Sequence, residues 1–323
     1  MKRIALLTSC GDAPGMNAAI RAVVRTAIYN GVEVYGIYRG YDGLINMDMK
    51  KLSKSDVANI IHRGGTVLKT ARSEAFRTKE GRSKAFQSLE SQSIEGLIVI
   101  GGNGTYTGAL KLSDEHDVNV VGIPGTIDND IYGTDYSIGF DTAINTAIDA
   151  VDKIRDTADS HSRLFFIEVM GRHSGYIALH TGIGSGASAV FLPEKENSVL
   201  EYIDTLYKGA RRSKLFNLVI VAEGNTFGNA NEIAKVVSDK YEKLDVKTTI
   251  IGHLQRGGSP TASDRVLSSQ LGYHAVEGLL AGQSKVAVGI VNKEVTYTEL
   301  VKAISLKKAP DDNMIQMSEI LAL

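Results

Sequence analysis

Short apolar runs rich in Val and Ile alternate along this chain with longer segments of helical periodicity. Runs that are apolar at nearly every position are typical of strands covered on both faces, and hence of parallel sheets. The predicted strands are Ile4–Thr8, Val32–Tyr38, Leu97–Ile100, Val120–Ile123, Leu164–Val169, Ala189–Leu192, Leu218–Ala222, Thr249–Ile251 and Val286–Ile290.

The intervening segments have the spacing of amphipathic helices. One apolar stripe follows Pro14 and consists of Ile20, Val23, Val24, Ala27 and Ile28. We expect Pro14 in the first turn of this helix and Gly31 at its end. A second stripe, Ile144, Ala147, Ile148 and Val151, predicts a helix that begins near Asp141. This alternation of strands and helices predicts a doubly wound α/β protein.

Length and charge narrow the class of protein. A chain of 323 residues exceeds what one hydrophobic core usually serves, so we expect two domains. A net charge of −1 argues against nucleic acid or a membrane surface as the main partner. No apolar stretch approaches the roughly 18 residues of a membrane span, and we expect a cytoplasmic protein. Cys10 is the only cysteine, which excludes an intrachain disulfide and a Cys-based metal cluster, and we expect it to be partly buried.

Polar loops follow several of the predicted strands. Open α/β sheets bind ligands beyond the carboxyl ends of their strands, so these loops are expected to form one site. They are Thr8–Gly15, Gly101–Thr105, Pro124–Asp130, Met170–Arg172, Glu223–Gly224 and Gly252–Gly258.

Two of these loops, Thr8–Gly15 and Gly101–Thr105, are rich in glycine and precede helices. Glycine lets the backbone approach phosphate, and the N–H groups at a helix start favour anions. Either loop taken alone fits an ordinary tight turn equally well. Neither matches the P-loop or the strict G-x-G-x-x-G pattern, which disfavours a P-loop ATPase and an ordinary NAD enzyme.

Asp128 and Asp130 are two positions apart, and in an extended loop their carboxylates share a face. One can then accept a proton while the other helps to hold a cation. The alternative is a structural use in an Asx turn or a helix cap. The preceding Pro-Gly-Thr and the nearby glycine-rich loop favour the chemical use.

Several cationic side chains lie in or beside these loops. Guanidinium groups can grip phosphate with two hydrogen bonds, although any one of them can equally be a solvated surface group. The candidates are Arg72, Arg77, Arg163, Arg172 and Arg256. Phosphoryl transfer needs mainly positioning and charge stabilisation, which this set supplies. For His253 a hydrogen bond to substrate and a structural role both stay open, because no partner lies at metal-ligand spacing.

Four segments match a known family. They are Gly11–Ala19 (GDAPGMNAA), Pro124–Asp130 (PGTIDND), Glu168–Arg172 (EVMGR) and Gly252–Gly258 (GHLQRGG). With these motifs the chain resembles the bacterial ATP-dependent 6-phosphofructokinases over essentially its whole length. PGTIDND is highly specific, and the four together leave little room for chance.

The resemblance implies transfer of the γ-phosphoryl group of MgATP to the 1-hydroxyl of fructose 6-phosphate, giving fructose 1,6-bisphosphate and ADP in glycolysis. By position, Asp128 is the base that takes the hydroxyl proton, with Thr126 and Asp130 beside the reacting phosphoryl group. Arg72 and Arg172 stabilise charge in the transition state.

The resemblance also implies the binding residues. The ATP site comprises Gly11, Tyr41, Arg72, Arg77, Gly102, Asn103, Gly104, Thr105 and Gly108. The sugar phosphate is held by Thr126, Asp128, Asp130, Arg163, Met170, Gly171, Arg172, Glu223, Lys247, His253 and Arg256. Arg163 and Lys247 act from a neighbouring subunit, so a homotetramer is expected. Asp130 and Asn103 are placed at the magnesium ion. Gly104 and Gly125 match the ATP-using branch, because the pyrophosphate-using branch tends to carry Asp and Lys at these two positions.

Three positions depart from the family pattern. Asn103 replaces an aspartate that helps with magnesium, Lys247 replaces an arginine that grips the 6-phosphate, and Cys10 replaces a glycine in the nucleotide loop. We expect weaker magnesium or nucleotide binding than is usual, because hard cations prefer anionic oxygen. Asn103→Asp should accordingly raise activity at limiting magnesium.

The family's effector site for ADP or phosphoenolpyruvate is altered too. Its matching residues are Arg21, Arg25, Arg155, Gly186, Arg212 and Lys214. Ser188 stands where the family has a glutamate, and Phe216 where it often has a histidine. Feedback control is therefore expected to differ.

By fold analogy the resemblance implies two Rossmann-like three-layer α/β/α domains with mostly parallel sheets and the active cleft between them. The larger, nucleotide-binding domain is expected at 1–139 plus 255–305, and the smaller, sugar-phosphate-binding domain at 140–254 plus 306–323. Besides the active kinase, two hypotheses remain. One is a weakened relative that binds nucleotide as a regulatory subunit, and the other, a dinucleotide oxidoreductase, fits the fold class alone.

Overall fold

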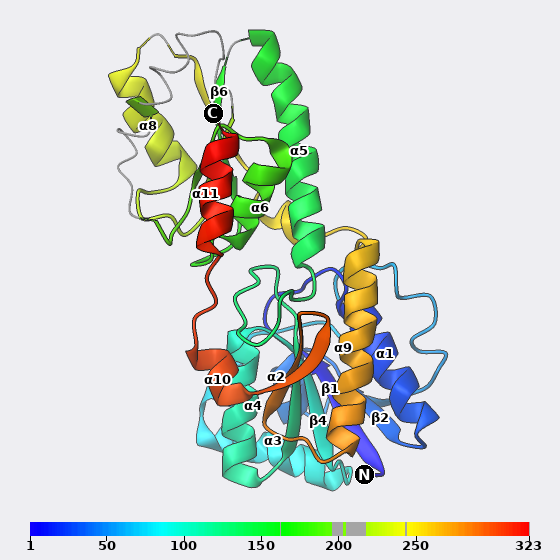
Figure 1. The fold of residues 1–323 in the computed structure, drawn as a ribbon. Helices are drawn as coiled ribbons and strands as arrows, with labels where there is room; N and C mark the ends of the chain where they lie inside the picture. Colours follow the sequence, from blue (N-terminus) through cyan, green and yellow to red (C-terminus); the bar gives the residue numbers. More distant parts are fainter. Residues whose placement is uncertain (162, 196–202, 205–217, 243, 323) are drawn as a thin grey trace. The chain divides into compact units, whose positions relative to one another are not determined.

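The computed structural model describes residues 1–161, 163–195, 203–204, 218–242 and 244–322. The chain divides into two compact units, each with its own sheet. Unit 1 contains Met1–Thr142 and Arg256–Lys308, and unit 2 contains Ala143–Gln255 and Ala309–Leu323. Figure 1 shows the elements of both units coloured along the chain.

Unit 1 contains a seven-stranded sheet in the order β11-β10-β5-β4-β1-β2-β3. Its strands are β1 (Arg3–Thr8), β2 (Glu33–Ile37), β3 (Met49–Leu52), β4 (Gly96–Gly101), β5 (Asn119–Pro124), β10 (Val286–Val291) and β11 (Glu294–Glu299). The five central strands are parallel, and the two edge strands pair antiparallel with their neighbours.

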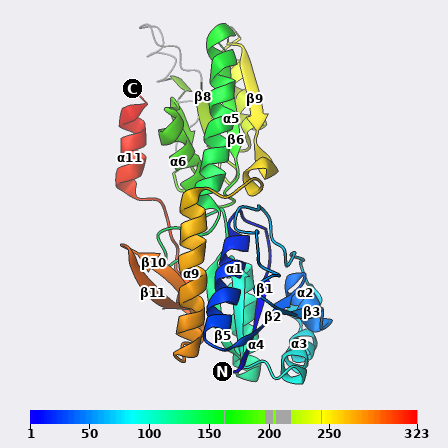
Figure 2. The same ribbon diagram turned by 90° about the vertical axis from the view of Figure 1, so that its right-hand side faces the viewer.

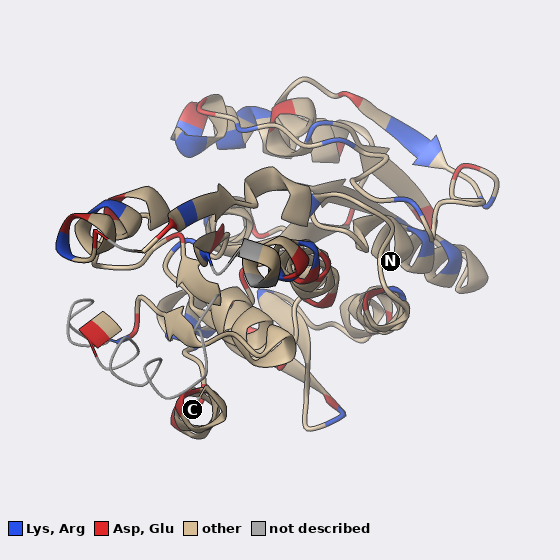
Figure 3. Cartoon of the chain, turned by 90° about the horizontal axis from the view of Figure 1, so that it is seen from above, with Lys and Arg blue, Asp and Glu red and all other residues tan. Residues whose placement is uncertain are grey.

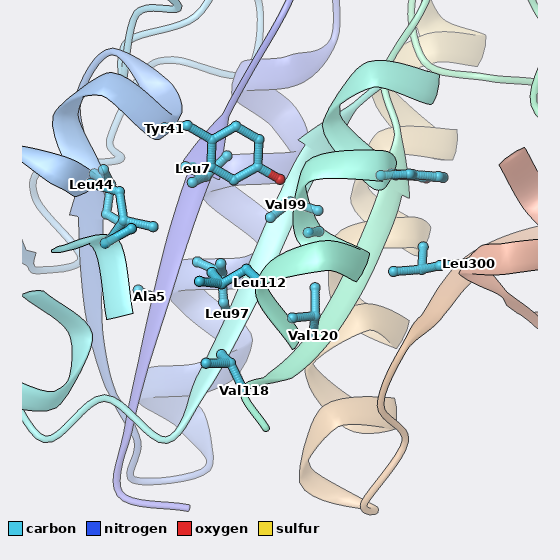
Figure 4. Packing of buried hydrophobic residues seen from close by; sticks show 14 of the residues in the cluster. Ala5, Leu7, Tyr41, Leu44, Leu97, Val99, Leu112, Val118, Val120 and Leu300 are labelled. Carbon is cyan, nitrogen blue, oxygen red and sulfur yellow. The ribbon is translucent and has the colours of Figure 1, made fainter. Parts of the chain in front are cut away.

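Helices cover both faces of this sheet. They are α1 (Met16–Tyr29), α2 (Gly40–Ile45), η1 (Ala75–Arg77), α3 (Lys79–Ser91), α4 (Asn103–His116), α9 (Ala262–Leu280) and α10 (Leu300–Ser305). Helices α1 and α9 lie side by side on one face, and α2, α3 and α4 lie on the other, as the turned view in Figure 2 shows. Figure 4 shows the core on the second face, where Leu7, Leu97 and Val99 pack against Tyr41, Leu44 and Leu112.

Unit 2 has a four-stranded parallel sheet in the order β7-β8-β6-β9. Its elements are α5 (Phe140–His161, which begins in unit 1), β6 (Leu164–Val169), α6 (Tyr176–Ser185), β7 (Ala189–Phe191), β8 (Leu218–Ala222), α8 (Ala230–Lys240), β9 (Val246–Ile250), the 3-10 helix η2 (Gly252–Arg256) and α11 (Asp312–Leu321). Helix α8 covers the face of Phe166 and Phe191. Helix α6 covers the opposite face, because a Cβ at Gly182 would meet Val190.

The α/β fold class with mostly parallel sheets is confirmed, with local differences. Strands β3 and β11 were missed because they are partly exposed edge strands with polar sequences, MKKL and EVTYTE. Strand β9 begins three residues before the predicted start. Pro14 was wrongly placed inside the first helix, which begins at Met16 after Gly15 at φ 112°.

Two further features concern surfaces. None of the helices in the described ranges combines the length and the apolar composition that crossing a bilayer requires. In the ribbon of Figure 3 the positions of Lys and Arg are interspersed with those of Asp and Glu along the described elements.

Candidate active site

Strands β1 and β4 are parallel neighbours in the sheet of unit 1. After β1 the chain proceeds toward one edge of the sheet, and after β4 it proceeds toward the other edge. Strand β1 is followed by α1 and β2 on one side, and β4 by α4 and β5 on the other. This reversal is a topological switch point, where open α/β sheets have their ligand crevice. Both glycine-rich loops lie here, and the backbone N–H of Ser9 donates to the carbonyl of Ile100 at 3.0 Å.

Gly101 is required by the close approach of these two loops. A Cβ built there would lie 2.3 Å from Thr105 Oγ1 and 2.7 Å from the carbonyl oxygen of Ser9. Because glycine has no Cβ, Thr105 Oγ1 can donate to that same Ser9 carbonyl, at 3.3 Å. The start of α4 is thereby fixed against the loop after β1.

A pocket of about 370 Å³ opens beside these loops within unit 1. It contains five of the predicted ATP-site residues, Tyr41, Arg72, Arg77, Gly104 and Gly108. Its other lining residues are Ser9, Cys10, Ala71, Ser73, Glu74, Phe76, Arg82, Thr107 and Lys111. Four predicted residues are not among the lining residues: Gly11 and Gly102 lie in the adjoining loops, and Asn103 and Thr105 lie in the first turn of α4.

Tyr41 forms a rigid part of the pocket wall. Its ring stacks on Phe76 with centroids 3.9 Å apart and planes 9° from parallel. Burial raises the pKa of Tyr41 well above its ordinary value, so the phenol stays protonated. Its hydroxyl donates to the carbonyl of Thr105 at 2.6 Å, which ties the stacked pair to α4.

Arg82 fixes the same wall, and no sequence motif pointed to it. The guanidinium is buried and makes two hydrogen bonds of 2.7 Å with the carboxylate of Glu115. Its Nη1 also donates to the carbonyls of Phe76, at 3.0 Å, and Arg77, at 2.7 Å. One arginine therefore holds the short helix η1 in place against α4.

The Pro124–Asp130 loop follows β5, the next strand beyond β4. Asp128 is only 4% exposed, and its backbone N–H donates to Thr126 Oγ1 at 3.2 Å. Asn129 lies at φ 52°, a left-handed conformation that Asn tolerates. Its side-chain Oδ1 accepts from the N–H of Ser137 at 2.9 Å, so Asn129 takes the structural part in this turn.

Asn103 joins this loop to the glycine-rich loop. Its Nδ2 donates to Asp130 Oδ2 at 2.8 Å. Its Oδ1 is buried and accepts no hydrogen bond within the described part of the chain. A Cβ at Gly102 would lie 3.6 Å from Thr126 Cβ, so the two loops run alongside one another. The structure thus brings Asn103, Thr126 and Asp130 together.

Asp264 supports the far end of the same loop and was not found from the sequence. It is 1% exposed and accepts from the N–H groups of Gly139, at 2.9 Å, and Thr142, at 2.8 Å. Burial raises its pKa despite these hydrogen bonds. Asp264 lies in the first turn of α9, where a carboxylate is common, so its role had no distinguishing signal.

In unit 2, two of the predicted sugar-phosphate loops are neighbours. The N–H of Arg172 donates to Glu223 Oε2 at 3.3 Å. The chain is tightly folded here, since a Cβ at Gly171 would lie 2.4 Å from the carbonyl oxygen of Ser174. The N–H of Met170 donates to the buried Gln255 Oε1 at 2.8 Å, so the Gly252–Gly258 segment also touches this cluster.

Arg163 and Lys247 meet on one carboxylate in unit 2. Arg163 Nε lies 2.7 Å from Asp245 Oδ2, and Lys247 Nζ lies 2.7 Å from Asp245 Oδ1. Hydrogen bonds from Lys247 and then Arg163 lower the pKa of Asp245. The two predicted phosphate-binding cations therefore form one cluster on this chain.

The remaining predicted residues are dispersed. Arg256 belongs to unit 1, where its Nη1 donates to the carbonyl of Asp12 at 3.1 Å, whereas His253 is exposed in unit 2. Arg21 and Arg25 lie one turn apart on α1, and burial together with the charge of Arg25 lowers the pKa of Arg21. Arg155 donates to the carbonyl of Ser185, beside Gly186. Arg212, Lys214 and Phe216 lie outside the described residues.

Cys10 was expected to be partly buried, and this was wrong, because it is exposed in the pocket. The backbone of Cys10 lies at φ 68°, in the left-handed region that favours glycine. Cys10→Gly should therefore raise the free energy of unfolding by about 0.5–1 kcal/mol. This is the conformational cost of a left-handed residue with a Cβ, minus the entropy that a glycine loses on folding. Urea unfolding checks this. Ser9→Gly, at a neighbour without positive φ, should destabilise instead, and equal losses for both variants would contradict the strain argument.

Comparison with known proteins identifies the family. The phosphofructokinase family model matches residues 3–279. The chain is 54% identical to ATP-dependent 6-phosphofructokinase 1 of Thermus thermophilus and 51% identical to the ATP-dependent 6-phosphofructokinase of Halalkalibacterium halodurans, covering 100% of both chains in each comparison. The phosphofructokinase structure from Saccharomyces cerevisiae matches 100% of this chain and 48% of its own, at 37% identity and a TM-score of 0.89. The chain therefore belongs to the phosphofructokinase family.

Proposed function

We propose that this chain is an ATP-dependent 6-phosphofructokinase, which transfers the γ-phosphoryl group of ATP to the 1-hydroxyl of fructose 6-phosphate. The enzyme names of its full-length relatives support the reaction. The observation that carries the proposal is the buried Asp128 in a turn that Asn103 joins to the glycine-rich loop. That arrangement sets a proton acceptor beside a phosphate cradle at the sheet's switch point.

ATP as the phosphoryl donor fits the pocket of unit 1. The stacked Tyr41 and Phe76 offer an aromatic surface, and Arg72 and Arg77 supply positive charge for phosphates. Gly104 borders the pocket, and its Cβ position lies 3.3 Å from Cys10 Sγ, so the acidic side chain of the pyrophosphate-using branch would project into this space. At Gly125 even a Cβ would lie 2.9 Å from Ile100 Cγ2 and 3.0 Å from Met16 Cε. These contacts favour the ATP-using branch.

In the proposed mechanism Asp128 takes the proton of the 1-hydroxyl as the hydroxyl oxygen attacks the γ-phosphorus of ATP. The bond from that phosphorus to the bridging oxygen breaks, and ADP leaves. Thr126, whose hydroxyl accepts from the Asp128 backbone, stands beside the transferring group. Arg72 and Arg172 balance the negative charge that spreads over the phosphoryl oxygens. Because transfer of this group depends on positioning, the fixed geometry of the Asp128 turn is the main contribution of the protein.

A magnesium ion that arrives with ATP fits the residues present. Mg²⁺ usually takes one or two carboxylates and completes its shell with waters and substrate phosphates. Asp130 supplies a carboxylate, and the buried Oδ1 of Asn103 is an oxygen without a hydrogen bond from the described residues. Within those residues no group of three or more His, Cys, Asp or Glu could hold a metal alone. Asp130 and Asn103 would hold the ion, which neutralises charge on the phosphates when bound.

The sugar phosphate is assigned to Met170, Gly171, Arg172, Glu223, His253 and Arg256, with Arg163 and Lys247 reaching the 6-phosphate of a neighbouring subunit. The cluster on Asp245 supports this division, since it holds both cations at one place.

A homotetramer and a cytoplasmic location remain predictions, as does an effector site that includes Arg21 and Arg25. The adjacency of these two like charges on α1 suits an anion.

A coupled assay of fructose 1,6-bisphosphate formation from ATP and fructose 6-phosphate tests the function. Turnover that requires both substrates is expected. Binding of ATP and the sugar phosphate without turnover would instead select the regulatory-subunit hypothesis, which the relatives reported above do not support.

A further inference from the structure

Lys308 stands at the last position of unit 1, just beyond α10. Its side chain is half-buried, and Nζ donates to the backbone carbonyl of Asp135 at 2.8 Å. Asp135 belongs to the loop that follows the Asp128–Asp130 turn. A lysine 173 positions away from Asp135 in sequence therefore contacts the loop that adjoins the turn proposed to carry the chemistry.

The Asp135 carbonyl is a fixed point next to that turn. It also accepts from Asn129 Nδ2 at 3.1 Å, so Lys308 and Asn129 share one acceptor. Asp135 is itself tied to β10, because its N–H donates to the carbonyl of Ile290 at 2.8 Å. Its Oδ2 accepts from the N–H of Asn292 at 2.8 Å. Lys308 thus reaches the centre of the turn through one rigid carbonyl.

The charge of Lys308 also acts on the turn. Burial lowers the pKa of Lys308 to about 8, while the carboxylates of Asp135 and Asp130 act in the opposite direction. Asp130 therefore lies within electrostatic reach of this cation as well as in a hydrogen bond with Asn103. The carboxylate that we assign to magnesium thus has a hydrogen bond from Asn103 and a charge interaction with Lys308.

We infer that Lys308 is a positioning residue, which holds the Asp128–Asp130 turn in its reactive geometry and offsets the charge of Asp130. This inference rests on the proposed role of Asp130. Lys308 acts through the Asp135 carbonyl and through its charge.

Two consequences follow for a variant without the cation, Lys308→Met. A looser turn misplaces Asp128, so kcat should fall about tenfold, with KM for ATP and fructose 6-phosphate nearly unchanged. With the neighbouring positive charge gone, Mg²⁺ should stabilise the substrate-free protein more than it stabilises wild type. The second effect is a change in the Mg²⁺-induced shift of melting temperature, which lost packing alone would not produce.

The experiment compares Lys308→Met and Lys308→Arg with Lys307→Met, the exposed neighbouring lysine. We expect Lys308→Arg to retain most of kcat, because it keeps both the charge and a donor, and Lys307→Met to behave as wild type. Lys308→Gln, which keeps a donor without charge, serves if the Met variant does not fold. Wild-type kcat together with a wild-type Mg²⁺ response in the uncharged variant would overturn the inference, as would an equal effect at Lys307.

Asp130→Asn, measured in parallel, distinguishes a failure of the role proposed for Asp130 from a failure of the role inferred for Lys308. If Asp130→Asn loses activity and Lys308→Met does not, the inference on Lys308 fails and the proposed site stands. If Asp130→Asn keeps wild-type kcat and Mg²⁺ response, the role assigned to Asp130 fails, and the Lys308 inference fails with it.

Discussion

Asp128→Asn should lower kcat by about 10²- to 10⁴-fold, which is the usual contribution of a positioned general base. The side chain is nearly isosteric, so the buried turn around Asn129 and Ser137 should persist. What is lost is a carboxylate that can accept the proton of the attacking hydroxyl. The coupled assay gives kcat and both KM values for the purified variant. We expect KM for ATP to stay near the wild-type value, because the nucleotide pocket does not include Asp128.

Asp264→Asn is the matched control for this variant. Asp264 is as deeply buried and is also hydrogen-bonded to backbone, but it supports the loop end at Gly139 and Thr142. Its replacement should cost about 1–3 kcal/mol of stability through a poorly satisfied buried group. The kcat of the folded fraction should remain near wild type. If Asp128→Asn raised only the apparent KM for fructose 6-phosphate, the base would be misassigned.

The fold was predictable from the sequence where burial requires apolar residues at successive positions. Central strands such as β4 and β8 are buried at every position and read as continuous apolar runs. Edge strands β3 and β11 have one open side, so their residues need not be apolar and the same rule misses them. Strand β9 was only partly found for a related reason, since no residue in it is fully buried.

The site was predictable where topology alone brings residues together. Loops after parallel strands lie at one edge of the sheet, so the loops after β4 and β5 were expected in one site, and in the structure Asn103 donates to Asp130. The assignment of these two residues to magnesium came from the family resemblance. The supporting residues Arg82, Asp264 and Lys308 could not be found this way. Asp264 and Lys308 contact a backbone amide or carbonyl at sequence separations of 125 and 173, and Arg82 contacts the carbonyls of Phe76 and Arg77 close to it in sequence. Contacts of a side chain with the backbone leave no motif.

Asn103→Asp separates two effects that the sequence alone combined into one. From the family resemblance, a restored carboxylate should simply improve magnesium binding. In the structure, Asn103 Nδ2 donates to Asp130 Oδ2 at 2.8 Å, so the substitution removes a donor and sets two carboxylates against each other. Without metal, this repulsion should lower the melting temperature and raise the pKa of one of the two acids. With metal, both oxygens become ligands, and affinity should rise by about 10- to 100-fold.

The decisive measurement is therefore the melting temperature of the substrate-free protein across a magnesium titration, followed by activity at limiting magnesium. We expect Asn103→Asp to start below wild type in chelator and to gain more from magnesium than wild type does. Asn46→Asp, an exposed residue whose amide donates to the carbonyl of Asp42, adds the same charge away from the site and should show no added magnesium response. A variant that is destabilised in chelator yet gains no extra magnesium response would place the ion elsewhere. In that case the Asn103–Asp130 hydrogen bond serves only to join the two loops, because its loss would lower the melting temperature without changing the response to magnesium.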